Sequence, residues 1–144
     1  MIKKDTVKLL GECDAGIKMG VASIEDTLPY ARSGALKERL SASKREHERL
    51  GAECEAMLRR YGDAGKEPPL IAKGMSKMKT AMRLGLHPGD KTVAVLTYDG
   101  CTMGVKSLSA FLNKYEAAEE RAKDIAKKLI AMEDKLAEDM RGYL

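Results

Sequence analysis

The chain has 144 residues, of which 44% are hydrophobic and 33% charged, and it carries a net charge of +4. This length suffices for one domain with its own core, so disulfides or metals are not needed for stability. Three cysteines without a C-x-x-C pair argue against a disulfide framework and a cysteine metal site. There is no apolar run long enough for a membrane span or a signal peptide, so we expect a cytoplasmic protein.

Apolar side chains recur in steps of three and four along the first half, which predicts a hairpin of two amphipathic helices over residues 5–62. Asp5 is suited to cap the first helix, and Pro29 is suited to end it. Ser33 is expected to open the second helix, and Gly62 stands where a C-cap glycine belongs. The predicted buried lines are Val7, Leu10, Asp14, Ile17, Val21, Ile24 and Leu28 in the first helix, and Leu36, Leu40, Ser43, His47, Leu50, Cys54, Met57 and Tyr61 in the second.

Residues 63–90 are expected to form a long crossover that contains a short amphipathic helix, because glycines and prolines interrupt the pattern there. Asp90 is suited to cap a third helix, and a fourth helix completes a second hairpin over residues 91–143. The turn between these two helices is placed between Leu112 and Ala118, where the apolar spacing slips. Their predicted buried lines are Ala94, Tyr98, Cys101, Val105, Leu108 and Leu112, and then Ala122, Ile125, Leu129, Met132, Leu136 and Met140.

The two halves of the chain share a repeat. At an offset of 84 residues, Gly16–Ile24 and Gly100–Leu108 are identical at five positions, and the two buried lines coincide. Two hairpins joined by a long crossover are the arrangement of one class of helix bundles, the ferritin-like folds. The sequence therefore predicts an all-α, antiparallel four-helix bundle of the ferritin-like kind, as a single domain over residues 1–144. The alternative is chance similarity between two amphipathic helices.

The order of short motifs resembles a bacterial family of ferritin-like domains of unassigned function. These motifs are Asp14-Ala-Gly16, Arg45-Glu-His-Glu-Arg-Leu50, the Gly-Asp-Ala-Gly linker with its prolines, the short crossover helix, and Tyr98-Asp-Gly100. The resemblance implies a bundle fold, and it implies no activity.

A di-iron centre in such a bundle needs a Glu from each of two helices and a Glu-x-x-His motif from each of the other two. No Glu-x-x-His occurs in this chain, Lys44 stands three residues before His47, and the fourth helix lacks histidine. We therefore expect no metal and no cofactor, and the sequence favours a role without catalysis.

Asp14 and His47 interrupt apolar lines, and in a hairpin that turns near residue 31 they lie at one level. Tyr98 is the repeat equivalent of Asp14. Because an unpaired carboxylate in a core is costly, Asp14 is expected to form a direct or water-bridged hydrogen bond with His47 or Tyr98. This polar cluster is either a structural contact that fixes the register or a small-molecule or single-metal site.

A second face of the duplicated helices carries glycine and methionine. Its members are Gly16, Met19 and Gly20 in the first helix, and Gly100, Met103 and Gly104 in the third. A glycine within a helix costs about 1 kcal/mol relative to alanine, so this face is expected to meet something at close range. The candidates are the crossover, the sister helix and a second subunit, and we expect a homodimer or a larger assembly.

The crossover is basic, since residues 63–91 hold six basic and three acidic side chains. The basic crossover residues proposed for such a contact are Lys73, Lys77, Lys79 and Arg83. The rest of the chain is nearly neutral, so nucleic-acid binding is not expected, whereas an acidic partner at the crossover is an option. A solvated helix face is the plainer interpretation.

Three functions remain open from the sequence. The missing metal ligands favour a non-enzymatic interaction or stress-associated bundle. The second function is a metal- or small-molecule-binding site around Asp14, His47 and Tyr98. The third is a binding module that presents residues 63–91 to an acidic partner.

Overall fold

The computed structural model describes residues 1–68, 80–81 and 83–144, and within these ranges the chain forms helices and no strand. The all-α prediction is confirmed. The helices are α1 (Ile2–Thr27), α2 (Gly34–Arg60), α4 (Asp90–Lys114) and α5 (Glu120–Met140), with the short 3-10 helices η1 (Leu28–Tyr30) and η2 (Arg141–Tyr143). In the described part of the chain, no helix is long and apolar enough to cross a membrane.

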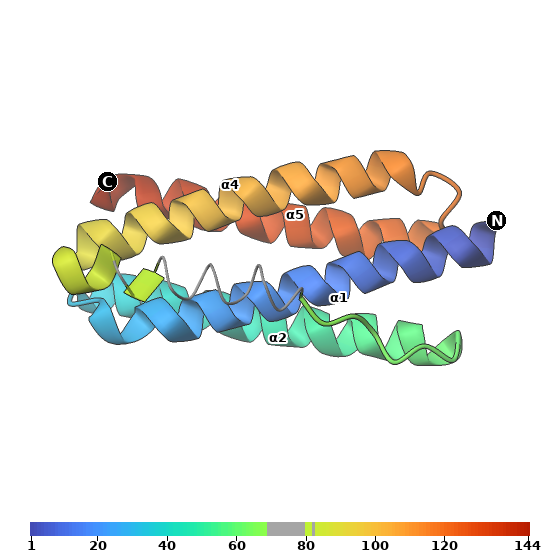
Figure 1. Ribbon diagram of the computed structural model, residues 1–144, viewed down its shortest axis with the longest axis horizontal. Helices are drawn as coiled ribbons and strands as arrows, with labels where there is room; N and C mark the ends of the chain where they lie inside the picture. Colours follow the sequence, from blue (N-terminus) through green and yellow to red (C-terminus); the bar gives the residue numbers. More distant parts are fainter. Residues whose placement is uncertain (69–79, 82) are drawn as a thin grey trace.

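The four long helices lie side by side (Figure 1). α1 and α2 run in opposite directions as one hairpin, and α4 and α5 do the same as a second, with α4 antiparallel to α1. α2 ends at one end of the bundle and α4 begins at the other, so the chain between them connects opposite ends of the molecule. Of the short helix predicted there, residues 80, 81 and 83–86 are helical, and the rest lies outside the described residues.

Local signals set several helix ends as predicted. Ser33 is the N-cap of α2, and its hydroxyl oxygen accepts the backbone N–H of Leu36 at 3.3 Å. Pro29 lies in η1, directly after the end of α1. Gly62 follows α2 with a φ of +71°, a left-handed conformation that glycine adopts without strain.

The two predicted aspartate caps are wrong. α1 already begins at Ile2, and the N-cap of α4 is Gly89. The Asp90 carboxylate instead accepts the backbone N–H groups of Arg32, at 2.6 Å, and Ser33, at 3.1 Å. Each carboxylate therefore accepts backbone N–H groups at or just before the start of a helix in the other hairpin. For Asp5 the donor is Ala117, in the turn before α5, at 3.1 Å.

Hydrogen bonds of this kind run in both directions between the hairpins. The hydroxyl of Thr6 in α1 accepts the N–H of Glu119, the N-cap residue of α5, at 2.8 Å. At the repeat offset of 84, Thr6 corresponds to Asp90. Their donors also correspond, because Ser33 is the N-cap residue of α2 and Glu119 is the N-cap residue of α5. The internal duplication therefore extends to the tertiary contacts that fix the two hairpins against each other.

The core consists of two apolar clusters, one toward each end of the bundle. One contains Leu9, Leu10, Leu58 and Leu129, and the other contains Leu36, Leu40, Leu84 and Met140. Burying a leucine contributes about 1.5–3 kcal/mol, so these clusters account for much of the stability. The polar side chains His47 and Glu133 lie between them and belong to neither.

The predicted buried lines match most of this core. In α2 every predicted position is buried except Tyr61, which is half-buried. In α1 and α4 about half of the predicted positions are buried and the others are half-buried. In α5 the prediction fails at one position, because Met132 is half-buried while its neighbour Glu133 is buried.

A candidate ligand-binding groove between α1 and α4

Asp14 and His47 are both buried, each with 1% exposure, but they bind different partners. Asp14 Oδ2 accepts the backbone N–H of Lys66 at 2.9 Å and lies 2.8 Å from Lys18 Nζ. Tyr98 is half-buried and packs against the second apolar cluster. The predicted direct hydrogen bond from Asp14 to His47 or Tyr98 is therefore wrong. The physical reason is that the segment after α2 returns along α1 and supplies a backbone donor, which side-chain patterns do not reveal.

The surroundings of Asp14 are closed. Gly65 has a φ of +92°, and a Cβ atom there would lie 2.5 Å from Asp14 Oδ2. The Lys66 ammonium pairs with Glu12, and Lys18 Nζ also lies 2.9 Å from Glu67 Oε1. The carboxylate is thus enclosed by the chain itself, and it holds the segment 62–68 against α1.

His47 is held from two sides. Its Nδ1 lies 2.8 Å from the Ser43 carbonyl oxygen, and its Nε2 lies 2.9 Å from Glu133 Oε1. Burial alone would lower the pKa of His47. The hydrogen bond and charge of Glu133, together with the Ser43 carbonyl, outweigh burial, so the pKa lies above its ordinary value. Because the carbonyl and the carboxylate are both acceptors, the geometry suits an imidazolium that donates from both nitrogens.

Glu133 was not among the predicted site residues, because Met132 beside it fits the apolar spacing equally well. Glu133 could have been found by aligning the second helices of the two hairpins, α2 and α5. His47 and Glu133 are 86 residues apart, and at that offset α2 and α5 begin at equivalent positions. The buried positions then coincide as Leu36 and Ala122, Leu40 and Ala126, Ser43 and Leu129, His47 and Glu133, Leu50 and Leu136, Gly51 and Ala137, and Cys54 and Met140. The pair therefore consists of equivalent residues from the two hairpins.

Two glycines flank the pair from the other helices. A Cβ atom at Gly20 of α1 would lie 2.9 Å from the His47 ring, and one at Gly104 of α4 would lie 3.7 Å from Glu133 Cδ. These glycines are also equivalent, at the offset of 84. A di-iron centre needs carboxylates from all four helices at one level, and two of the four present glycine here. The residues do not fit such a centre.

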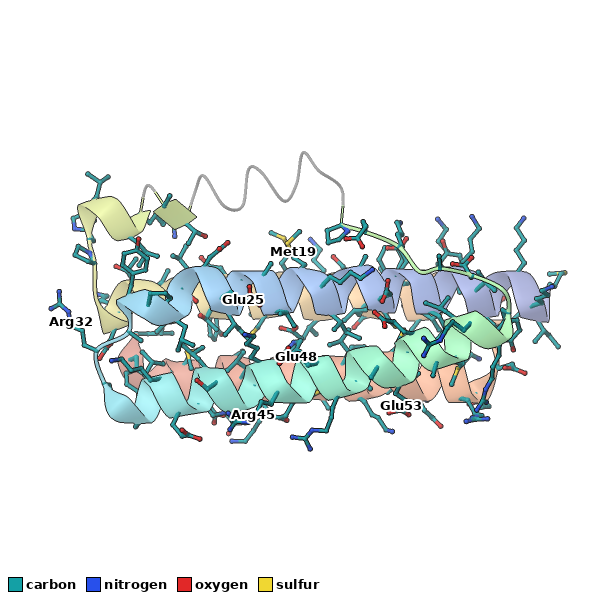
Figure 2. All side chains as sticks on the ribbon, turned by 90° about the horizontal axis from the view of Figure 1, so that it is seen from below. Met19, Glu25, Arg32, Arg45, Glu48 and Glu53 are labelled. Atoms are coloured by element: carbon teal, nitrogen blue, oxygen red, sulfur yellow. The ribbon has the colours of Figure 1, made fainter. Side chains whose placement is uncertain are left out.

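A groove lies between α1 and α4, with His47 and Glu133 in its wall. Its volume is about 330 Å³, and its lining is mainly apolar. The described residues that line it are Glu12, Ala15, Gly16, Met19, Gly20, Ser23, Ile24, His47, Pro68, Thr97, Gly100, Cys101, Met103, Gly104, Ser107, Leu108, Phe111, Leu129, Glu133 and Leu136. All six predicted glycine and methionine residues of the duplicated face are among them. Met19 extends from the edge of α1 that faces away from α2 (Figure 2).

The glycines of this groove differ in how closely they are packed. A Cβ atom at Gly16 would make an ordinary contact with Leu129 at 3.6 Å, and one at Gly100 would meet nothing within 4 Å in the described part of the chain. Among the described residues, only Gly20 is required by a close neighbour, the His47 ring. No backbone of the described residues approaches Gly16, Gly100 or Gly104 closely, and most of the predicted crossover helix lies outside the described residues.

The cysteines do not provide a nucleophile. All three are free and buried. Burial raises the pKa of Cys54 to about 12 and also raises that of Cys13. Burial and the neighbouring Glu133 carboxylate raise the pKa of Cys101, which lines the groove. Since the thiolate is the reactive form, these thiols are inert near neutral pH.

The predicted basic patch is only partly described. Lys73, Lys77 and Lys79 lie outside the described residues. Arg83 is half-exposed, and its guanidinium lies 3.8 Å from Asp99 Oδ2. The residues that flank His47 in the sequence, Arg45 and Glu48, are exposed on α2 (Figure 2).

No family model, no curated protein and no solved structure matches the chain. Within residues 1–68, 80–81 and 83–144, no three His, Cys, Asp or Glu side chains are grouped so that they could hold a metal ion. The site thus consists of an apolar groove, glycines along two of its walls, and one buried polar pair.

Proposed function

We propose that the protein is a ferritin-like bundle without a di-iron centre and that it binds a small, mainly apolar molecule in the groove between α1 and α4. The helix directions, the repeat and the reciprocal hydrogen bonds between the two hairpins support the ferritin-like assignment. The proposal places the small-molecule site of the sequence-based hypothesis around His47 and Glu133 instead of around Asp14.

The observation that supports this proposal is the set of glycines that packing among the described residues does not explain. Gly16, Gly100 and Gly104 each cost about 1 kcal/mol relative to alanine within a helix. An alanine at these positions would meet only ordinary contacts, or none, among the described residues. The side chains that are missing there leave space in the groove, which is the property that a ligand site needs.

Size and polarity agree with this use. A groove of about 330 Å³ lies within the usual range for small-molecule sites, which are mostly apolar with a few fixed polar groups. His47 is 1% exposed and Glu133 is 8% exposed, so neither depends on bulk water for its interactions. The inert thiols favour binding over nucleophilic catalysis.

The proposal is tested by a ¹H–¹⁵N NMR titration of the full chain with 2-phenylethanol. We expect shifts concentrated on the amides around Gly16, Gly20, Gly100 and Gly104. A Gly104→Leu variant, whose side chain would occupy part of the groove, should abolish these shifts. The matched control is Gly34→Ala at the start of α2, where a Cβ atom meets nothing within 4 Å among the described residues.

The proposal fails if the shifts are scattered over the surface or persist unchanged in Gly104→Leu. It also fails if no shift appears up to the solubility limit of the probe. The control variant should bind as the wild type does.

A further inference from the structure

Among the described residues, one carboxylate oxygen of Glu133 receives no strong donor. Oε1 lies 2.9 Å from His47 Nε2. Among the described residues, the remaining donor close to this carboxylate is the thiol of Cys101, which is a weak donor. Glu133 is 8% exposed and lines the groove, so its second oxygen can be reached from the groove.

The glycine of α4 keeps this oxygen uncovered. A Cβ atom at Gly104 would lie 3.8 Å from Glu133 Oε2, and no larger side chain stands at this position. A buried carboxylate oxygen gains strongly from a donor, because a hydrogen bond to a charged group contributes more than one between neutral groups. The groove therefore offers an acceptor beside its apolar walls.

The charges around the groove decide which donor suits it. His47 faces Glu133 from α2 with both ring nitrogens placed to donate, so the carboxylate charge is already balanced within the wall. The other acidic residue of the lining, Glu12, is paired with Lys66. A cationic ligand would add an unbalanced charge to a mainly apolar site, and an anionic ligand would be repelled by the carboxylate.

We propose that the groove selects neutral molecules with a hydroxyl group on an apolar body, and that Glu133 Oε2 accepts the hydrogen bond of that hydroxyl. This inference rests on the proposed function and names the ligand class for the same site. Glu133 acts as the specificity-determining residue, and His47 holds it in place and balances its charge.

The test compares four molecules that share one apolar body: 2-phenylethanol, its methyl ether, 2-phenylethylamine and phenylacetate. Dissociation constants come from the same NMR titration of the full chain at pH 6.5. We expect 2-phenylethanol to bind about tenfold more tightly than the ether, which has no donor. The amine and the carboxylate should bind more weakly than the alcohol.

A variant assigns the preference to Glu133. In Glu133→Gln the amide can still accept from His47, while its NH₂ group replaces an acceptor by a donor, so the alcohol and the ether should bind within about twofold of each other. Glu138→Gln on the exposed side of α5 is the matched control and should keep the tenfold preference. The wild-type comparison alone remains decisive if Glu133→Gln folds poorly.

The outcomes separate this inference from the proposed function. Equal binding of the alcohol and the ether to the wild type would overturn the inference and leave the apolar groove in place. Tightest binding of the amine would also overturn it, because the carboxylate would then act as an ion-pair partner. If none of the four molecules binds in the groove, the proposed function itself is wrong.

Discussion

Asp14 on α1 and Glu133 on α5 are both buried carboxylates, yet the bundle treats them differently. Asp14 receives a backbone N–H from Lys66 and the ammonium of Lys18, and Gly65 closes over it. Glu133 receives His47 on one oxygen, and the glycine nearest to it, Gly104, leaves room beside the other.

This difference helps to distinguish a structural polar contact from a binding site. Both carboxylates are buried, so the exposed fraction alone does not distinguish the two sites. What separates them is the surroundings: a backbone N–H and an ammonium meet at Asp14 Oδ2 under Gly65, whereas Glu133 lines a groove. At Asp14 a backbone segment is held in place, whereas at Glu133 the glycine wall keeps an acceptor open to a groove. The following experiments test this contrast, beginning with the largest effect.

Removing one partner of the central pair should be the most damaging change. Glu133→Leu leaves His47 buried without its acceptor, and we expect a loss of about 3–5 kcal/mol in the free energy of unfolding at pH 6. The double variant His47→Leu/Glu133→Leu should recover most of this loss, because an apolar pair replaces the polar one. Urea unfolding followed by circular dichroism measures both. A loss below about 1 kcal/mol in the single variant would show that the pair is not coupled as described.

Removing the enclosed carboxylate should have an intermediate effect. Asp14→Ala leaves the N–H of Lys66 without its acceptor, and we expect a loss of about 1–3 kcal/mol. Hydrogen exchange at the Lys66 amide should accelerate, since the segment 62–68 is no longer held. The order of affinities for 2-phenylethanol and its ether should not change, because Glu133 is intact. A reversal of that order would place Asp14 within the binding site.

The smallest expected effect is a dependence of stability on pH. The pKa of His47 is raised in the folded protein, mainly by Glu133 on α5 and Ser43 on α2 against the opposing effect of burial. Its contribution is therefore complete below the ordinary pKa of about 6.5 and is lost as pH rises through the raised value. The other charged or titratable groups that face this pair are Glu46 on α2 and Cys101 on α4.

This dependence is isolated in a His87→Asn background, where His47 is the remaining histidine. The stability advantage of this protein over the same background with His47→Leu/Glu133→Leu should shrink between pH 6 and about 8.5. Both proteins contain the same three cysteines, so ionisation of the unfolded thiols, which begins to matter near a pH of about 8.5, acts on both stabilities. An advantage that grows with pH would contradict the assignment of an imidazolium to His47.

The parts of this architecture that depend on nearby residues were predictable from the sequence. Apolar spacing located the helices, and Ser33, Pro29 and Gly62 marked their ends, because capping and turn conformation act within a few residues. Asp5 and Asp90 carried the same local signal, but their carboxylates accept backbone N–H groups just before helices of the other hairpin. A sequence pattern shows that a side chain can accept a backbone N–H, and tertiary packing decides which one.

The candidate site was predicted only in part, because tertiary packing also decides the partners of its residues. The residue numbers of the hairpin predicted Asp14 and His47 at one level, and this was wrong. His47 lies beside Gly20, and Asp14 lies closer to Cys54, because the two helices are shifted along each other relative to a hairpin that turns at residue 31. The donor that satisfies Asp14 belongs to the backbone of Lys66, which side-chain patterns do not show. The apolar spacing of α5 fits Met132 as well as Glu133. Glu133 could be recognised only by aligning α5 with α2 at an offset of 86 residues, which pairs Glu133 with His47.

The central claim is that the groove glycines preserve space and are not needed for packing. Urea unfolding of four alanine variants tests it most directly. Alanine at Gly16, Gly100 or Gly104 should raise the free energy of unfolding by about 1 kcal/mol each, because helix propensity improves and no close contact forms. Gly20→Ala should lower it by about 1–3 kcal/mol, because its Cβ would lie 2.9 Å from the His47 ring. If the first three variants are destabilised as Gly20→Ala is, the glycines serve packing within the chain, and the claim is wrong.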